Sequence, residues 1–221
     1  MSKLETIYVG DGARRYNERR EHSDIWQREQ ATVGAALRPL LQPGDRVLDV
    51  AAGTGRWLEL YAERRVEATL LDVSGDMLKV AAAQAAALGV SIDLVERNVL
   101  TMPALPPGEW LISTRFFNWI SLRSIERLLR MAMAAGYRHV AVTMRCVDHA
   151  APWAQRLGAR WRWRKKNVQV LLGIRRKGTY YLQSRAAFAA MLGRLGCTIA
   201  TEHAIERPSG EAYTLFIIHR L

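Results

Sequence analysis

Strand-like and helix-like hydrophobic patterns alternate along most of this chain, and this alternation restricts the folds open to it. Expected strands lie at residues 46–50, 68–73, 92–95, 110–114 and 139–144, and expected helices at 25–41, 56–65, 75–88 and 121–135. Parallel strands need crossover helices between them, so this order predicts a mostly parallel sheet covered on both faces. The predicted fold class is α/β, with a doubly wound, seven-stranded sheet.

The end of the chain follows a different pattern. A helix is expected at 184–195, followed by strands at 198–203 and 213–219 with a turn at Pro208-Ser209-Gly210. Consecutive strands joined by a short turn predict a C-terminal antiparallel hairpin.

The basic residues are concentrated in one stretch. Between His149 and Thr201 the chain has eleven Lys and Arg residues and no Asp or Glu, so this stretch accounts for the whole net charge of +11. Such segregation predicts an anionic partner or substrate, with a solvated basic surface as the alternative. Residues 146–182 are therefore interpreted as a basic and aromatic insertion after the fifth strand, whose tryptophans either contact a ligand or cap the sheet.

Composition excludes several classes of protein. Apolar residues make up 49% of the 221, which is enough for a globular core. No apolar run reaches the roughly 18 residues of a membrane-spanning helix, and the first residues do not resemble an export signal. Cys146 and Cys197 are too few for a disulfide scaffold or a zinc site, so buried thiols and no metal are expected. The expected location is the cytoplasm, free or peripheral at the inner face of the membrane.

The first expected strand leads into a small-residue loop. In VLDVAAGTGRW, Asp49 ends the strand, and Ala51-Ala52-Gly53-Thr54-Gly55 opens a helix. Small residues let a backbone approach a ligand closely. A dinucleotide-binding loop reads G-x-G-x-x-G, but here Leu58 stands at the third glycine position after Gly53 and Gly55, and Ala51 precedes them, which disfavours a nicotinamide or flavin cofactor.

This loop resembles the first motif of the class I S-adenosylmethionine-dependent methyltransferases, an acid followed by small residues and G-x-G. A second acid, Asp72 in LLDVSGDML, follows 23 residues after Asp49, at the end of the second strand. There a carboxylate accepts hydrogen bonds from both ribose hydroxyls. Each aspartate also has a structural interpretation, Asp49 as a brace of the loop and Asp72 as a helix cap. Together they favour a Rossmann-like domain that binds S-adenosylmethionine.

The resemblance implies roles for further residues. Asn98 takes the place of an acid that often holds the adenine amino group, Arg115 lies at the mouth of the site, and the N-terminal segment resembles a lid. The implied cofactor-binding residues are Tyr16, Arg20, Asp49, Ala51, Gly53, Gly55, Asp72, Asn98, Val99 and Arg115. The expected organisation is one domain, with a lid and helix at 1–44, a cofactor-binding core at 45–145, the insertion at 146–182, and a final helix and hairpin at 183–221.

The implied function is methyl transfer to an O or N atom of an anionic small molecule or a glycan- or lipid-linked substrate. A hydroxyl or amine acceptor needs a base, for which His149 and Asp148 are candidates, whereas a carboxylate or phosphate acceptor needs none. Candidate substrate-binding residues are Tyr8, Asn118, Arg160, Trp161, Arg175 and Tyr180. The alternatives are an RNA or DNA methyltransferase that uses the insertion for phosphate contacts, and an inactive adaptor at nucleic acid or an anionic membrane.

Overall fold

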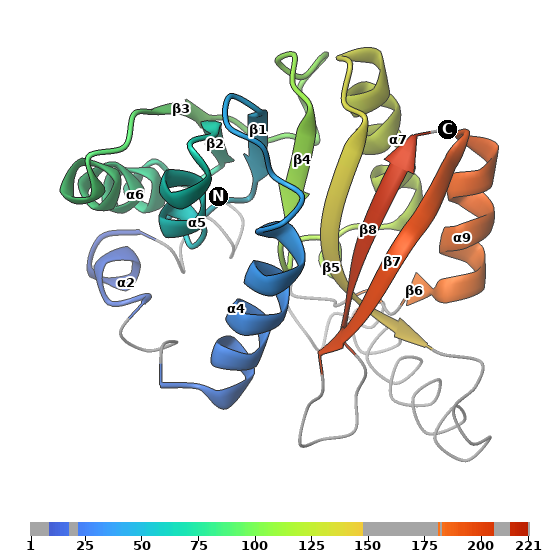
Figure 1. Cartoon of the computed structure of the whole chain (residues 1–221), viewed down its shortest axis with the longest axis horizontal. Coiled ribbons are helices and arrows are strands. Elements are labelled where there is room, and N and C mark those ends of the chain that lie inside the picture. The colour runs from blue at the N-terminus through green and yellow to red at the C-terminus, as the bar shows by residue number, and fades with distance from the viewer. Residues whose placement is uncertain (1–8, 18–21, 148–180, 182, 206–212, 221) are drawn as a thin grey trace, which may run out of the picture.

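The computed structural model describes residues 9–17, 22–147, 181, 183–205 and 213–220, which form an α/β fold around one sheet (Figure 1). The strands are β1 (Arg46–Val50), β2 (Glu67–Asp72), β3 (Ile92–Glu96), β4 (Trp110–Ser113), β5 (His139–Val147), β6 (Gln183–Ser184), β7 (Cys197–Ile205) and β8 (Tyr213–Arg220). The helices are α2 (Asp11–Arg14), α4 (Asp24–Leu37), α5 (Leu58–Arg64), α6 (Gly75–Leu88), α7 (Leu122–Ala134) and α9 (Arg185–Arg194).

Seven strands lie in the order β3-β2-β1-β4-β5-β8-β7, and β6 pairs with β5 off this path. The first five strands are parallel, while β8 pairs antiparallel with both β5 and β7. The prediction of a mostly parallel, seven-stranded sheet with a C-terminal antiparallel hairpin is therefore confirmed.

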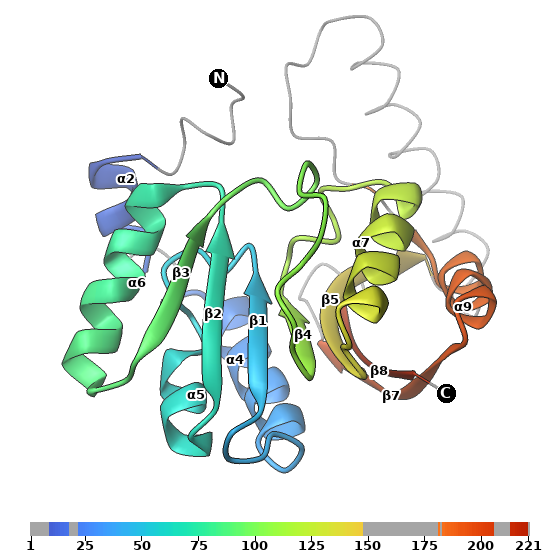
Figure 2. The same cartoon turned by 90° about the horizontal axis from the view of Figure 1, so that it is seen from above.

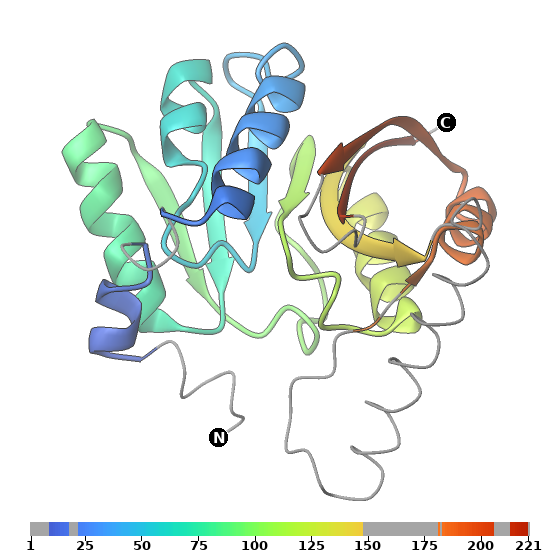
Figure 3. The same cartoon turned by 90° about the horizontal axis from the view of Figure 1, so that it is seen from below.

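Two layers of helices cover the sheet (Figures 2 and 3). One apolar cluster joins the sheet to α4, α5 and α6, with Val33, Tyr61 and Ala81 in its centre. The other joins it to α7 and α9 through Ile125 and Phe188. β1 and β4 are buried over nearly their whole length, as expected of parallel strands between two helical layers.

The turn from β1 to α5 needs unusual backbone angles. Ala51, Gly53 and Gly55 have φ values of 58°, 60° and 78°, in the left-handed region that favours glycine. A Cβ at Gly55 would lie 2.5 Å from Cδ1 of Leu58 and 3.1 Å from Cβ of Ala81. Glycine at this position thus lets α5 begin directly above α6.

The two helices that flank the C-terminal ends of the strands have conventional caps. The Ser74 hydroxyl accepts a hydrogen bond from the Met77 amide at the start of α6, and Gly89 ends that helix with φ 66°. Ser121 caps α7 in the same way through the Ser124 amide. These caps start both helices at the edge of the sheet where the strands end.

Some expected features differ or lie elsewhere. Helix α4 ends at Leu37 rather than residue 41, β5 continues to Val147, and the short strand β6 was not predicted. Cys146 and Cys197 are buried free thiols, as expected. In the part of the chain that the structure describes, no helix has the length and apolarity to cross a membrane. The turn at 208–210 and nearly all of the predicted insertion lie outside the described residues, and the predicted domain boundaries stay predictions.

Candidate functional site

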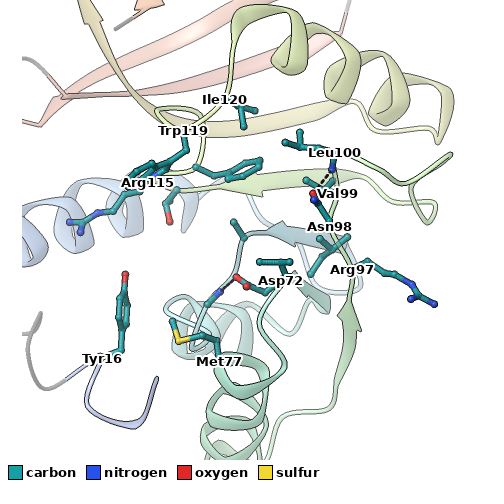
Figure 4. Close-up of a pocket in the computed structure, with 16 residues that line it drawn as sticks. Tyr16, Asp72, Met77, Arg97, Asn98, Val99, Leu100, Arg115, Trp119 and Ile120 are labelled. Atoms are coloured by element: carbon teal, nitrogen blue, oxygen red, sulfur yellow. Dashed lines mark hydrogen bonds between the residues drawn. The ribbon is translucent and has the colours of Figure 1, made fainter. Parts of the chain in front are cut away.

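A pocket of about 270 Å³ lies at the C-terminal ends of β1, β2, β3 and β4 (Figure 4). This is the edge at which parallel α/β proteins bind their ligands. Its lining consists of Tyr16, Ala51, Gly53, Leu71, Asp72, Val73, Met77, Arg97, Asn98, Val99, Leu100, Thr114, Arg115, Phe116, Trp119 and Ile120. Seven of the ten residues implied as cofactor-binding line the pocket, together with the neighbours of Asp72 and Asn98.

Asp72 joins the two halves of this site. Its Oδ2 accepts a hydrogen bond from the Gly53 amide at 2.8 Å, and its Oδ1 accepts one from the Ser74 amide at 2.9 Å. Burial raises the pKa of the Asp72 carboxyl, while these backbone hydrogen bonds oppose the shift. Each carboxylate oxygen keeps a second lone pair for a ligand.

Asp49 has a different environment. It is 1% exposed, does not line the pocket, and accepts a hydrogen bond from the Tyr61 hydroxyl at 3.1 Å. Burial raises the pKa of the Asp49 carboxyl to about 7, although the bond from Tyr61 opposes the shift. The Asp49 carboxylate thus contacts α5 rather than the pocket, and its two predicted roles stay predictions.

Asn98 stands at the other end of the pocket, after β3. Its Oδ1 accepts a hydrogen bond from the Leu100 amide at 3.0 Å and thereby closes a turn. The Val99 and Leu100 side of this turn lines the pocket. The Asn98 Oδ1 is the atom expected to bind an adenine amino group. One of its lone pairs is already used in this hydrogen bond within the protein.

Arg115 follows β4 with φ 66°, an unusual angle for a residue other than glycine. Its amide donates to the Thr143 hydroxyl at 2.8 Å, which fixes the backbone there. The side chain turns toward α4 and away from Asn98 (Figure 4), and its Nε donates to Glu29.

Glu29 is a functional candidate that the sequence analysis missed. This carboxylate on α4 is fully buried, and it pairs with Arg56 at 2.6 Å as well as with Arg115. The guanidinium of Arg56 stacks on Trp26, 3.6 Å from the ring centroid. The sequence spacing of Glu29 could have revealed that it is buried, because it lies on the same face of α4 as the buried residues Trp26 and Val33.

Asn118 lies beneath the mouth of the pocket rather than in its lining. It is 2% exposed, donates to the Tyr213 hydroxyl at 2.9 Å, and accepts from the Arg145 amide at 2.7 Å. Its contacts connect β4, β5 and β8, and its predicted role in substrate binding stays a prediction.

The rest of the lining beside β4 is largely apolar. Phe116, Trp119, Ile120, Leu100 and Met77 all line the pocket. Trp119 and Ile120 lie across the pocket from Met77, with Leu100 beside Ile120 (Figure 4). Such a wall suits a flat, apolar part of a ligand. Tyr16 lies on the opposite side, at the same end as Arg115.

Other candidates from the sequence fall in parts of the chain that the structure does not describe. These are Tyr8, Arg20, Asp148, His149, Arg160, Trp161, Arg175 and Tyr180. Gly55 shapes the loop without lining the pocket.

Comparisons with known proteins agree with this geometry. Residues 47–136 match a family model described as a methyltransferase domain. The ubiquinone/menaquinone biosynthesis C-methyltransferase UbiE of Rhizobium etli (strain CIAT 652) is 42% identical over 109 residues, which cover 47% of this chain and 40% of that protein. This chain thus spans only about two fifths of the length of the curated relatives that it matches.

Solved structures show the fold over a longer range. Magnesium protoporphyrin IX methyltransferase (ChlM) from Synechocystis PCC 6803 with bound SAM has a TM-score of 0.71 at 15% identity, covering 99% of this chain and 95% of that one. The 1,6-didemethyltoxoflavin-N1-methyltransferase of Burkholderia thailandensis has a TM-score of 0.64 at 16% identity, covering 95% and 85%. At these identities the likeness concerns the fold.

Proposed function

We propose that this chain, whose residues 47–136 carry a methyltransferase domain within the class I fold, binds S-adenosylmethionine and transfers its methyl group to a small molecule. The observation that carries the proposal is the Asp72 carboxylate, which faces the pocket and is held by the Gly53 amide of the β1–α5 loop. This hydrogen bond connects Asp72 with the small-residue loop after β1, and these are the two sequence features on which the resemblance rests.

The pocket fits this cofactor. The Asp72 oxygens have lone pairs left for the two ribose hydroxyls, and the turn of Asn98, Val99 and Leu100 supplies a backbone edge and an apolar face for adenine. A Cβ at Gly53 would lie 3.3 Å from Cε of Met77, so glycine lets the loop pack closely against this pocket residue.

The chemistry that the cofactor supplies when bound is an electrophilic methyl group on a sulfonium. The task of the protein is therefore to orient an acceptor atom and to exclude water. Phe116, Trp119 and Ile120 provide an apolar wall for the acceptor, and Tyr16 covers the opposite side. For a hydroxyl or amine acceptor we propose His149 or Asp148 as the base.

Within this function, we propose an anionic small molecule or a glycan- or lipid-linked acceptor, methylated on O or N. The support for an anionic acceptor is the charge of the predicted insertion at 146–182. The UbiE relatives are named C-methyltransferases, which adds carbon as an acceptor atom to be tested. The proposed location is the cytoplasm or the inner face of the membrane.

Calorimetric titration with S-adenosylmethionine and S-adenosylhomocysteine tests cofactor binding. Asp72→Ala is expected to weaken binding tenfold or more, because it removes charge-assisted hydrogen bonds worth roughly 1.5–3 kcal/mol. Glu96→Ala is the matched control, since Glu96 ends the neighbouring strand in register with Asp72 but does not line the pocket. Equal affinities of the two variants would remove Asp72 from the site.

Radiolabelled cofactor in fractionated cell extract tests the acceptor. Label in a nuclease-resistant small-molecule, glycan or lipid fraction supports the proposal. Label in nuclease-sensitive material supports an RNA or DNA methyltransferase instead. Cofactor binding without any transfer of label supports the inactive adaptor.

A further inference from the structure

The apolar wall of the pocket belongs to the short loop that joins β4 to α7. Trp119 and Ile120 come directly before Ser121, the cap of α7, and both line the pocket. The Trp119 amide donates to the Phe116 carbonyl at 2.8 Å, which closes a turn. Residues 114–121 belong to neither a helix nor a strand. The positions of the two wall side chains therefore depend on contacts that reach this loop from other segments.

Asn118 is the first point at which other segments hold the loop. Its carbonyl oxygen accepts a hydrogen bond from the Tyr181 amide at 2.7 Å, and its Oδ1 accepts one from the Arg145 amide at 2.7 Å. Arg145 and Tyr181 stand on either side of residues 148–180 in the sequence. The described residues that flank this basic stretch thus both bond to the loop that carries the wall.

Gln183 is the second point at which the loop is held. Its side chain is buried, and its Nε2 donates to the Ile120 carbonyl at 3.1 Å. The backbone of Gln183 is itself fixed, because it pairs with Cys146 of β5 and is followed by Ser184, the cap of α9. A hydrogen bond from a buried amide fixes both the distance and the direction of the peptide that accepts it, which an apolar contact does not.

Trp119 lies between these two points. The residues before and after it, Asn118 and Ile120, both have their carbonyls bonded, so the backbone is held while the side chains line the pocket. Trp119 and Ile120 lie across the pocket from Met77 (Figure 4). A shift of the Ile120 peptide would change the space between this wall and Met77, whereas Asp72 keeps hydrogen bonds of its own. A misplacement of about 1 Å can slow a reaction by about 10²-fold.

From this arrangement we propose that Gln183 is a positioning residue that determines acceptor specificity. Through its hydrogen bond to the Ile120 carbonyl it sets where Trp119 and Ile120 stand, and thereby which acceptor fits between the wall and the cofactor. Gln183 does not line the pocket and acts only through the loop. This inference rests on the proposed function, in which the wall faces the acceptor.

Steady-state kinetics with radiolabelled S-adenosylmethionine tests the role of Gln183. The acceptor is supplied as the cell-extract fraction that takes up label, at a series of dilutions. Gln183→Leu is expected to raise the apparent KM for that fraction tenfold or more. The KM for S-adenosylmethionine and the affinity for S-adenosylhomocysteine should change less than threefold. A purely structural role would instead lower the folded fraction, and with it kcat, while both KM values stay unchanged.

Gln183→Glu provides a rescue that depends on pH. A protonated carboxyl has one O–H donor for the Ile120 carbonyl, whereas a carboxylate has none. Burial favours the neutral form. The apparent KM of this variant for the extract fraction should therefore lie within threefold of wild type at pH 5.5 and rise tenfold or more above it at pH 8.

Gln42→Leu and Gln42→Glu are the matched controls. The Nε2 of Gln42 also donates to a backbone carbonyl, that of Leu40 at 3.3 Å, but on the surface and outside the pocket lining. Both control variants should keep the two KM values within twofold of wild type at either pH.

Three results would overturn the role of Gln183 and leave the proposed function intact. The first is an apparent KM for the extract fraction within twofold of wild type in Gln183→Leu. The second is an equal loss of affinity for S-adenosylhomocysteine, because the effect would then not be confined to the acceptor. The third is a ratio of KM values in Gln183→Glu that does not change with pH. Wild-type protein that binds no cofactor or transfers no label overturns the proposed function, and this inference with it.

Discussion

Two aspartates that end neighbouring strands have different environments at the scale of single residues. Asp72 accepts hydrogen bonds from two backbone amides and faces the pocket, whereas Asp49 contacts the Tyr61 hydroxyl in a dry interior. Burial raises the pKa of both carboxyls, and for Asp49 it does so to about 7, because the hydrogen bond from Tyr61 offsets only part of the desolvation. The ionisation of Asp49 is therefore coupled to folding.

Asp49→Asn is expected to remove a pH-dependent loss of stability. Because the folded-state pKa of about 7 lies above the unfolded value of 3.8, the Asp49 contribution is present in full below pH 4 and is lost as the pH rises to about 7. Each unit of pKa difference corresponds to about 1.4 kcal/mol. Urea unfolding at pH 4.5, 6 and 7.5 should show the variant gaining stability relative to wild type as the pH rises.

Asp93→Asn is the control, because Asp93 is exposed on β3. Its unfolding free energy should keep a constant difference from wild type across the same range. Parallel pH curves for Asp49→Asn and wild type would show that Asp49 is already ionised in the folded protein.

Local spacing was enough to place several candidate residues at one site, while their roles in binding stay predictions. The resemblance placed Asp72, Asn98 and Arg115 at strand ends, and the structure brings them to one pocket. Glu29 contacts Arg115 across 86 positions of sequence, and no local pattern pairs them. Only its place on the buried face of α4 marks it as unusual, because charged residues are seldom fully buried unless paired.

At the scale of elements, the β1–α5 turn depends on glycine. Gly55→Ala is expected to lower the free energy of unfolding by about 2–4 kcal/mol, since a left-handed alanine costs roughly 1–2 kcal/mol and its Cβ would also clash with Leu58. Gly89→Ala, at φ 66° with no atom within 4 Å of the added Cβ, should cost only the roughly 1–2 kcal/mol of the left-handed backbone. Equal losses in chemical denaturation would mean that Leu58 moves away at no cost.

Helix α4 is attached to the sheet by the pairing of Glu29. Glu29→Gln should destabilise the protein by about 3–5 kcal/mol, because it leaves two guanidiniums buried without a carboxylate. Glu63→Gln removes a pair with Arg38 whose side chains are 46% and 51% exposed, and should cost less than about 1 kcal/mol. Denaturant midpoints of the two variants make the comparison, and equal shifts would contradict it.

Element boundaries were predictable where a local signal ends the element. The predicted bounds of α6 are those observed, because Ser74 caps its start and Gly89 its end. By contrast, the helical spacing of apolar residues continues past Leu37 into a turn, so the predicted end of α4 was too late. The predicted end of β5 was too early, because its last residues are held by pairing with β6 and β8. Such tertiary contacts extend a strand beyond what its own residues indicate.

At the scale of the whole molecule, a second cluster lies at the opposite end of the sheet from the pocket. The ring of His139 stacks on Trp110 at 4.6 Å between centroids and meets the ring of His219 at 4.7 Å. The buried His139 Nδ1 and His219 Nε2 have no hydrogen-bond partner among the described residues. Burial, followed by the neighbouring His219, lowers the pKa of His139.

The free energy of unfolding is therefore expected to fall in acid, because protonation of His139 is unfavourable in the folded protein. With a folded pKa below the unfolded value near 6.5, His139 favours the fold above that value, and this contribution is lost as the pH drops below it. His139→Phe should flatten the pH dependence of urea unfolding between pH 5 and 7 without changing cofactor affinity. His203→Phe, which alters a ring bonded to Thr201 of its own strand, is the control. A slope that matches wild type in the His139 variant would contradict the coupling.

The place of β8 also has a consequence for synthesis of the protein. Residues 213–220 are the last described strand, yet they lie between β5 and β7, and the Tyr213 hydroxyl contacts Asn118 and Thr143 beneath the pocket. Until this strand is in place, β5 has no neighbour on that side, and Asn118 and Thr143 lack their hydrogen bonds to the Tyr213 hydroxyl. The nascent chain therefore exposes an open sheet edge until β8 inserts between β5 and β7, and during this interval it is prone to pair with other chains.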